Sequence, residues 1–169
     1  IPGLKRYHKG KGTKIAFNPG TYQLRSSSEN LRKVLEEVSI LFVNKEEATK
    51  ISGLKSKSIK LVLRELQKTG PQTIVVTDGD KGAFAIPDNE LLHMPILPAP
   101  IIERTGCGDS FATGFLAAFI EGKTFPEALV WGAVNSSSVI QYVGAREGLL
   151  RKEQMSEASA KVSIKPERI

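Results

Sequence analysis

The chain has 169 residues, of which 40% are hydrophobic and 25% are charged, and its formal net charge is +6. This composition is typical of a soluble globular protein with one sizeable core, and no apolar run approaches the ~20 residues of a membrane span. The single cysteine, Cys107, excludes an internal disulfide, so we expect a reducing compartment, the cytoplasm.

The net positive charge is concentrated near the start of the chain. Of the 24 Lys and Arg residues, six precede the first acidic residue, Glu29, which leaves 18 basic residues to balance 18 acidic ones. A basic end without interleaved aromatic residues is typical of a solvated tail, so we expect no nucleic-acid partner. Residues 1–13 also contain three glycines and are predicted to form a basic loop or a disordered lead-in.

Patterns of short strands and amphipathic helices alternate from residue 14 onward. Residues 14–17 predict a short strand that ends in an Asn-Pro-Gly turn signal at 18–20. The next apolar residues recur at i, i+3, i+4 and i+7, as on one face of a helix: Leu31, Val34, Leu35 and Val38. The uninterrupted apolar run 40–43 then predicts a parallel strand that is covered on both faces.

Asn44 and Glu47 follow that strand and allow two interpretations. With Asn44 at the N-cap of a helix and Glu47 at N3, the pair matches a capping box, in which each side chain binds a backbone N–H of the helix start. Alternatively, a polar pair at the end of a strand can hold a hydrated Mg²⁺ ion through a carboxylate oxygen. Spacing alone favours the capping box.

A further helix and a further buried strand lead to a glycine-rich loop. Apolar residues at helical spacing between 59 and 66 mark the helix, and a Gly-Pro pair ends it. The β-branched run 73–76 predicts the strand, and a strand pattern resumes at 83–86. Between them lies Thr-Asp-Gly-Asp-Lys-Gly, residues 77–82, which is either a simple turn or a loop whose backbone and Lys81 face phosphate groups.

The segment 91–101 contains three prolines and is predicted to be extended. Leu92, Met94 and Ile96 alternate along it, which predicts an inward-facing edge strand. This extended path leads the chain directly into the turn at 105–109.

That turn reads Thr-Gly-Cys-Gly-Asp and precedes a helix predicted from Ser110 to Ile120, apolar nearly all round and therefore expected to be central. Two glycines around a small residue permit a sharp turn, after which the first helical turn directs unpaired N–H groups outward and attracts anions. Asp109 has two interpretations there. It either complements the helix dipole, which is worth about 0.3 to 1 kcal/mol, or acts as a base beside a phosphate. Spacing alone favours the dipole.

A second apolar helix is predicted from a capping-box pattern at 124–127 and runs on to Tyr142. Its polar interruption, Asn-Ser-Ser-Ser at 135–138, indicates either close packing or room for a flat ligand. Residues 143–146 end this helix. Residues 151–169 are predicted to form a final helix and a loosely held tail.

The polar loops at 44–47, 77–82 and 105–109 all follow strands of the alternating pattern, so we expect them to line one crevice at the edge of the sheet. In this order the sequence resembles the ribokinase-like (PfkB) family of carbohydrate and nucleoside kinases over residues 14–150. The family signature Asp-Thr-x-Gly-Ala-Gly-Asp-x-Phe is matched at 103–111 by the glycines, the second Asp and the Phe.

The resemblance implies an α/β fold, a Rossmann-like three-layer sandwich with a mostly parallel sheet flanked by helices, incomplete on its N-terminal side. It implies a nucleotide-binding and catalytic part at 14–150, preceded by the lead-in at 1–13 and followed by a helix and tail at 151–169. Family members are longer and carry a sugar-binding half upstream. The resemblance therefore implies that this half is missing before Ile1.

Carried over position by position, the resemblance makes Asp109 the base that takes a proton from the substrate hydroxyl. The backbone N–H groups of three residues would form the anion hole: Gly106, Cys107 and Gly108. Five residues would bind the nucleotide: Thr77, Gly79, Lys81, Gly82 and Asn135. Two residues would organise the magnesium and phosphate region: Asn44 and Glu47.

Three positions depart from the family pattern. Glu103 and Arg104 stand where the family usually has Asp and Thr, and in many relatives that Asp belongs to a monovalent-cation site. Glu103 is therefore a possible ligand of such a cation, and dependence on the cation stays open. Cys107 replaces the usual Ala and leaves the backbone donor in place.

We therefore expect a transferase, an ATP-dependent kinase that phosphorylates a hydroxyl of a small sugar or nucleoside and uses Mg²⁺. The expected partners are ATP and that substrate, with no nucleic acid and no membrane. A sheet edge left by a missing half favours a homo-oligomer. The alternatives are a nucleotide-binding or partner-binding fragment without catalysis, and a purely structural remnant.

Overall fold

The computed structural model describes residues 12–20, 23–24, 28–87 and 89–169, which form two compact units. The first unit holds the described residues up to Thr77 together with Ala85–Leu91, and the second holds Asp78–Phe84 and Leu92–Ile169. Most of the predicted basic lead-in, residues 1–11, lies outside the described residues. No helix within the described ranges is long and apolar enough to cross a membrane.

Three parallel strands run side by side in the first unit, in chain order. They are β1, β2 and β3: Ala16–Phe17, Ile40–Asn44 and Thr73–Thr77. The first four residues of β2 are buried, which confirms the predicted doubly covered strand. β1 is shorter than the predicted 14–17, because its ladder joins Ala16 to Ile40 and Phe17 to Leu41. β3 is followed in the sheet by β4 (Ala83–Ile86), whose last two residues belong to this unit.

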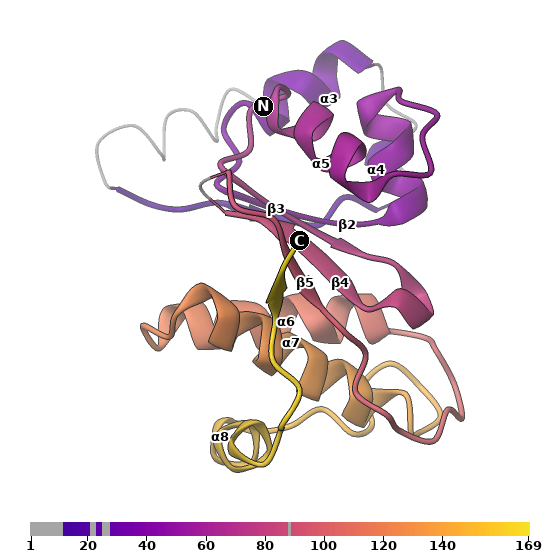
Figure 1. Cartoon of the computed structure of the whole chain (residues 1–169), viewed down its shortest axis with the longest axis vertical. Coiled ribbons are helices and arrows are strands. Elements are labelled where there is room, and N and C mark those ends of the chain that lie inside the picture. Colours follow the sequence, from indigo (N-terminus) through magenta and orange to yellow (C-terminus); the bar gives the residue numbers. More distant parts are fainter. Residues whose placement is uncertain (1–11, 21–22, 25–27, 88) are drawn as a thin grey trace. The chain divides into compact units, whose positions relative to one another are not determined.

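Among the described residues, the first unit includes the helices α3, α4 and α5: Ser28–Leu35, Lys45–Ser52 and Ile59–Gln67. α4 and α5 pack together and against these strands, on the same side of β2 and β3 (Figure 1). The predicted apolar face of α5 is confirmed, because Val62, Leu63 and Leu66 are fully buried. α3 ends before the predicted Val38, because the hydrogen bonds from residues 37 and 38 reach back three residues instead of four.

The second unit contains the first half of β4, then β5 (Leu92–Met94) and β6 (Glu167–Arg168), in that order along the sheet. β5 and β6 are antiparallel, and the pairs are Leu92 with Arg168 and His93 with Glu167. Two predictions are therefore wrong: β5 is not an edge strand, and the tail ends in a strand instead of being loosely held. Ile96 is 46% exposed, since β5 ends before its side chain could alternate inward.

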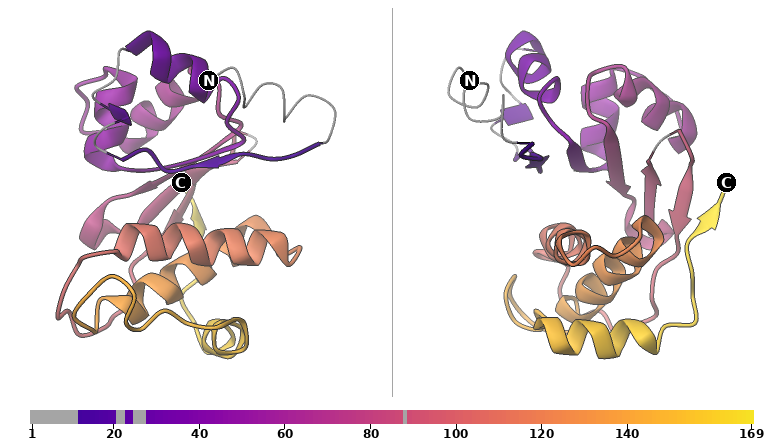
Figure 2. Two further views of the ribbon diagram at one scale, coloured as in Figure 1. Left: turned by 180° about the vertical axis from the view of Figure 1, so that it is seen from behind. Right: turned by 90° about the vertical axis from the view of Figure 1, so that its left-hand side faces the viewer.

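Three helices complete the second unit, α6, α7 and α8: Cys107–Ile120, Phe125–Val139 and Lys152–Ala160. α6 and α7 lie side by side in both views of Figure 2. Their backbones approach closely at two glycines. A Cβ at Gly114 would lie 2.7 Å from the Trp131 carbonyl oxygen, and one at Gly132 would lie 2.9 Å from the Phe111 ring. Glycine at both positions is thus a requirement of the crossing.

The ends of α6 and α7 differ from the predicted ends. α6 begins three residues before the predicted Ser110, because Gly106 takes the N-cap position. α7 ends at Val139 instead of Tyr142, and Tyr142 is half exposed. Ile120, the last residue of α6, is 81% exposed, whereas Phe111 and Phe115 are buried, as expected for a central helix. These differences leave the start of α6 as a well-defined turn followed by a long helix.

Candidate functional site

The start of α6 combines a left-handed glycine with open space beside the first helical turn. Gly106 is the N-cap with a φ of 79°, and the Ser110 N–H donates to its carbonyl oxygen at 2.8 Å. A Cβ at Gly106 would lie 2.7 Å from the Cβ of Ala145, so only glycine fits this position. A Cβ at Gly108 would meet no atom within 4 Å. A ligand atom can therefore approach the backbone at Gly108.

The backbone donors of the first turn of α6 point out of the helix start. The first N–H group bonded inside α6 is that of Ser110, so the N–H groups that precede it include those of the predicted anion-hole residues Gly106, Cys107 and Gly108. The Cys107 N–H also donates to the Arg104 carbonyl oxygen at 3.3 Å. The turn and the helix dipole together favour a bound anion, and the anion hole itself stays a prediction.

Asp109 occupies the third position of α6 and is exposed. Its carbonyl oxygen accepts the Thr113 hydroxyl at 2.8 Å, so its backbone is fixed within the helix. A carboxylate in this place complements the helix dipole and also lies next to the open space at Gly108. The two sequence-based interpretations are thus compatible, and the catalytic role stays a prediction.

Asn135 is buried in α7 and binds two other segments of the same unit. Its exposed fraction is 3%, its Nδ2 donates to the Ser110 carbonyl oxygen at 2.8 Å, and its Oδ1 accepts the Leu150 N–H at 3.1 Å. Both polar atoms of this side chain are bonded inside the protein, and its predicted role at the nucleotide stays a prediction. Sequence reasoning missed the bridge, since nothing near residue 135 identifies partners at positions 110 and 150.

The loop that follows Thr77 is a tight turn. Gly79–Lys81 forms a 3₁₀ turn, the Asp78 N–H donates to the Gly82 carbonyl oxygen at 2.8 Å, and the Lys81 N–H donates to the Asp78 carbonyl oxygen at 3.0 Å. Gly82 has a φ of 82°, and a Cβ there would lie 2.1 Å from the Met94 carbonyl oxygen. The backbone of this loop is therefore fixed by its glycines, and its contact with phosphates stays a prediction.

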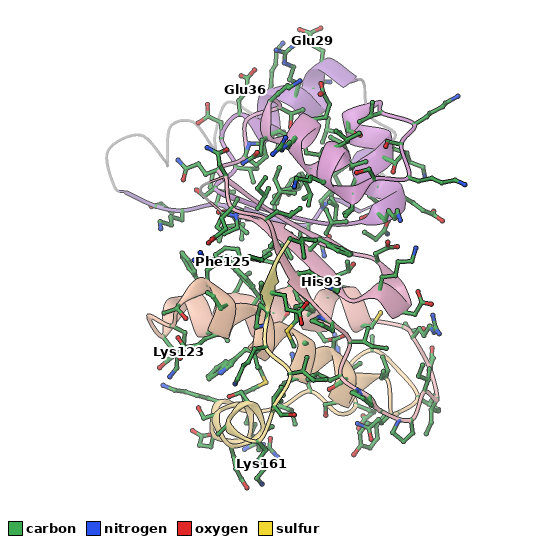
Figure 3. All side chains as sticks on the ribbon, in the orientation of Figure 1. Glu29, Glu36, His93, Lys123, Phe125 and Lys161 are labelled. Atoms are coloured by element: carbon green, nitrogen blue, oxygen red, sulfur yellow. The ribbon has the colours of Figure 1, made fainter. Side chains whose placement is uncertain are left out.

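His93 supports this loop from β5, where Figure 3 labels it. Its Nε2 lies 2.7 Å from the Lys81 carbonyl oxygen, and its ring stacks on Phe84 with 4.5 Å between the ring centroids. The Lys81 side chain itself is exposed. Nothing in the sequence connects His93 with the loop, because this contact depends on the path of β5.

Asn44, Glu47 and Thr77 belong to the first unit, whereas the other predicted site residues belong to the second. Asn44 and Thr77 are register partners at the ends of β2 and β3. The capping box is confirmed: the Asn44 Oδ1 accepts the Glu47 N–H at 2.9 Å, and the Glu47 Oε2 accepts the Asn44 N–H at 2.8 Å. The magnesium role stays a prediction. Among the residues that the structure describes, no group of three or more His, Cys, Asp or Glu could hold a metal.

Glu103 joins the approach to α6 to the segment after α7. Its Oε1 accepts the Thr105 hydroxyl, and its Oε2 accepts the Gly144 N–H at 2.8 Å. These two hydrogen bonds hold the pKa of Glu103 below its ordinary value of 4.5, and the bond from Thr105 has the larger effect. The carboxylate is therefore ionised at neutral pH.

A cavity of about 450 Å³ lies in the second unit beside the C-terminal half of α7, where no site residue was predicted. Its lining includes Ser137 of α7, Gln141 just after α7, Leu97, and Lys161 directly after α8. Figure 3 labels Lys161. The run of small residues at 135–138 was the available signal. It indicated either close packing or room for a flat ligand. In the structure Asn135 packs inside the protein, whereas Ser137 lines the cavity.

Comparison with known proteins places these features in a family context. Residues 9–152 match the family model of the pfkB family carbohydrate kinases. The cytidine kinase of Thermococcus kodakarensis is 34% identical over 140 residues, which cover 80% of this chain and 49% of that enzyme. The chain spans about half the length of the curated relatives it matches.

Two solved structures have a similar fold. The nucleoside kinase of Methanocaldococcus jannaschii has a TM-score of 0.77 at 28% identity, over 94% of this chain and 52% of that one. The ribokinase of Arabidopsis thaliana, complexed with ribose and ATP, has a TM-score of 0.81 at 25% identity, over 95% of this chain and 51% of that one. The predicted ribokinase-like α/β fold class is thereby confirmed.

Proposed function

Because this chain belongs to the pfkB family of carbohydrate kinases, we propose that it binds ATP and supplies the base for phosphoryl transfer to a hydroxyl of a sugar or nucleoside. The start of α6 carries this proposal. There the left-handed Gly106 sets up a helix whose first turn holds an exposed carboxylate, Asp109, next to the open space at Gly108.

In the proposed reaction the oxygen of the acceptor hydroxyl attacks the γ-phosphorus of ATP, and Asp109 takes the proton from that hydroxyl. The new O–P bond forms, the bond between the γ-phosphorus and the bridging oxygen of ATP breaks, and ADP leaves. The first-turn N–H groups of α6 stabilise the negative charge on the transferring phosphoryl group. The carboxylate and the donors thus act on different atoms, which explains why an anion site contains an Asp.

ATP and Mg²⁺ are the expected ligands of the remaining predicted residues. The exposed Lys81 side chain provides a positive charge for phosphate oxygens. Glu47 uses its Oε2 in the capping box, and we assign its Oε1 to a water of hydrated Mg²⁺. When bound, Mg²⁺ would neutralise phosphate charge. The Arabidopsis thaliana ribokinase complexed with ribose and ATP supports the choice of ATP.

The chemical class of the acceptor is inferred from the substrates named for similar proteins. Proteins similar in sequence include a cytidine kinase, a nucleoside kinase and a ribokinase. These names support a ribose-type hydroxyl as acceptor, free or within a nucleoside. Phosphorylation assays with cytidine, other nucleosides and free ribose, each with ATP, would separate these acceptors.

Nucleotide binding by this chain is tested by calorimetry of ATP with and without Mg²⁺. We expect saturable binding that is tighter with Mg²⁺. No detectable heat under either condition, confirmed by equilibrium dialysis, would refute the ATP site in this chain.

The base is tested by Asp109→Asn in the longest natural form of the protein. We expect the rate of phosphoryl transfer to fall by about 10² to 10⁴ while ATP affinity changes little. Glu153→Gln on the exposed first turn of α8 is the matched control, because it removes the same charge from another helix start. An undiminished rate in Asp109→Asn would show that the base assignment is wrong.

A further inference from the structure

Glu103 is attached to the segment after α7 through both its backbone and its side chain. The N–H groups of Ile102 and Glu103 donate to the Ile140 carbonyl oxygen at 2.8 and 3.2 Å. The Glu103 carboxylate accepts the Gly144 N–H at 2.8 Å, across 41 residues of sequence. It also accepts the Thr105 hydroxyl. The residue therefore joins the approach to α6 to residues 140–144.

The segment that Glu103 binds lies directly against the N-cap of α6. Besides the close approach to the Ala145 Cβ, a Cβ at Gly106 would lie 2.9 Å from the Ala145 Cα and 3.0 Å from its carbonyl oxygen. Ala145 follows Gly144, whose N–H is bonded to Glu103. A movement of Gly144 would consequently change the packing against Gly106 and displace the first-turn donors of α6.

The oxygens around Glu103 already accept hydrogen bonds from the protein. The Ile140 carbonyl oxygen accepts two donors, which occupy both of its lone pairs, and each carboxylate oxygen accepts one donor and keeps one lone pair. These oxygens therefore do not provide the set of several free lone pairs directed at one point that a monovalent cation needs. The Glu103 charge is compensated by an N–H and a hydroxyl. The hydrogen bonds of Glu103 therefore fix residues 140–144 beside the turn at the start of α6, and no bound cation is needed for this.

We propose that Glu103 is a positioning residue that holds residues 140–145 against Gly106, and that this segment needs no monovalent cation. The proposal rests on the proposed function for its consequence: the tether sets the first-turn donors that face the phosphates of ATP. The tether itself is a property of the second unit and can be measured without any ligand.

Hydrogen–deuterium exchange measured by mass spectrometry tests the tether. The wild-type chain, Glu103→Ala and Glu103→Gln are compared in KCl and in tetramethylammonium chloride at equal ionic strength. In wild type we expect the same exchange of residues 140–148 in both salts. In Glu103→Ala we expect exchange about tenfold faster, not restored by K⁺, because the Gly144 N–H has lost a charged acceptor. Glu103→Gln should be intermediate, since its amide oxygen can still accept this N–H.

The matched control is Glu147→Ala, which removes an exposed carboxylate from the same segment and should leave the exchange unchanged. Two results would overturn the proposal. One is an exchange rate in Glu103→Ala equal to that of wild type, and the other is clear slowing of the wild-type exchange by K⁺. If Glu103→Ala does not fold, the exchange rates of Glu103→Gln and of the wild type in the two salts still test the proposal.

Ligand affinity separates positioning from general support of the fold. We expect Glu103→Ala to weaken binding of the Mg²⁺ complex of a non-hydrolysable ATP analogue about tenfold and that of adenosine less than about twofold, because the tether affects only the phosphate end. Equal losses for both ligands would refute the positioning role. If the wild type binds neither ligand, the proposed function fails, and the exchange experiment alone decides the tether.

Discussion

Replacing Asn135 by alanine removes both hydrogen bonds that connect α7 to α6 and to the segment before α8. The Ser110 carbonyl oxygen loses the donor at 2.8 Å, and the Leu150 N–H loses the acceptor at 3.1 Å. Because Asn135 is 3% exposed, water does not readily replace the lost partners. The variant therefore tests whether the amide acts as a structural bridge.

The expected loss follows from the two partners separately. The Ser110 carbonyl oxygen can still accept its helical bond within α6, so losing the second donor costs about 1 kcal/mol. The Leu150 N–H is part-buried in an irregular segment, and leaving such a donor unsatisfied costs about 1 to 3 kcal/mol. We expect the free energy of unfolding to fall by roughly 2 to 4 kcal/mol in total.

Equilibrium urea unfolding of Asn135→Ala and wild type, followed by circular dichroism, measures this loss. Ser137→Ala is the matched control on the same helix. Its hydroxyl donates to the Val134 carbonyl oxygen within α7, and its removal should change the free energy of unfolding by less than about 0.5 kcal/mol. A third variant, Asn135→Asp, keeps the acceptor for Leu150 but places an oxygen against the Ser110 carbonyl, so it should also be destabilised at neutral pH.

A loss below about 0.5 kcal/mol in Asn135→Ala would refute the bridge. If such a variant also bound ATP more weakly than wild type, the nucleotide contact predicted from the sequence would be the better interpretation. If it lost stability as expected but bound ATP normally when folded, the structural role would be established and the nucleotide contact would be excluded.

Two further predictions concern glycine and a helix cap. Gly53→Ala places a Cβ in open space, so its cost is the left-handed backbone alone, about 1 to 2 kcal/mol, whereas Gly106→Ala adds the 2.7 Å contact with Ala145. Thermal unfolding should therefore show the larger loss for Gly106→Ala, and equal losses would contradict the crowding. Hydrogen bonds from the Thr124 hydroxyl, and to a smaller extent from its N–H, lower the pKa of Glu127 below 4.5. The ionised Glu127 therefore stabilises the fold above that pH, and the stabilisation is lost as the pH falls below it. Glu127→Gln should lower the Tm at about pH 7 and lower it less at about pH 3.5; a difference that is independent of pH would contradict the assignment.

Features that depend on a few neighbouring residues were predictable from the sequence. The capping box of Asn44 and Glu47 and the matching one at 124–127 both formed as predicted, because partners three residues apart meet whenever the helix forms. The buried strand β2 also formed as predicted, because a continuous apolar run identifies it without knowledge of its neighbours. The glycine turn before α6 belongs to this class only in part, because the turn formed at Gly106 but the helix begins at Cys107 instead of Ser110.

The structure alone decided which distant segments meet. The sequence did not predict that the tail would pair with β5, that Asn135 would bind Ser110 and Leu150, or that Glu103 would accept the Gly144 N–H. A strand pattern does not name its partner, and a lone Asn or Glu looks the same whether it faces solvent or another segment. The residue types at the candidate site were thus determined by the sequence. The bridge made by Asn135 and the tether proposed for Glu103 depend on contacts that exist only after the chain has folded, because those contacts join residues that are far apart along it.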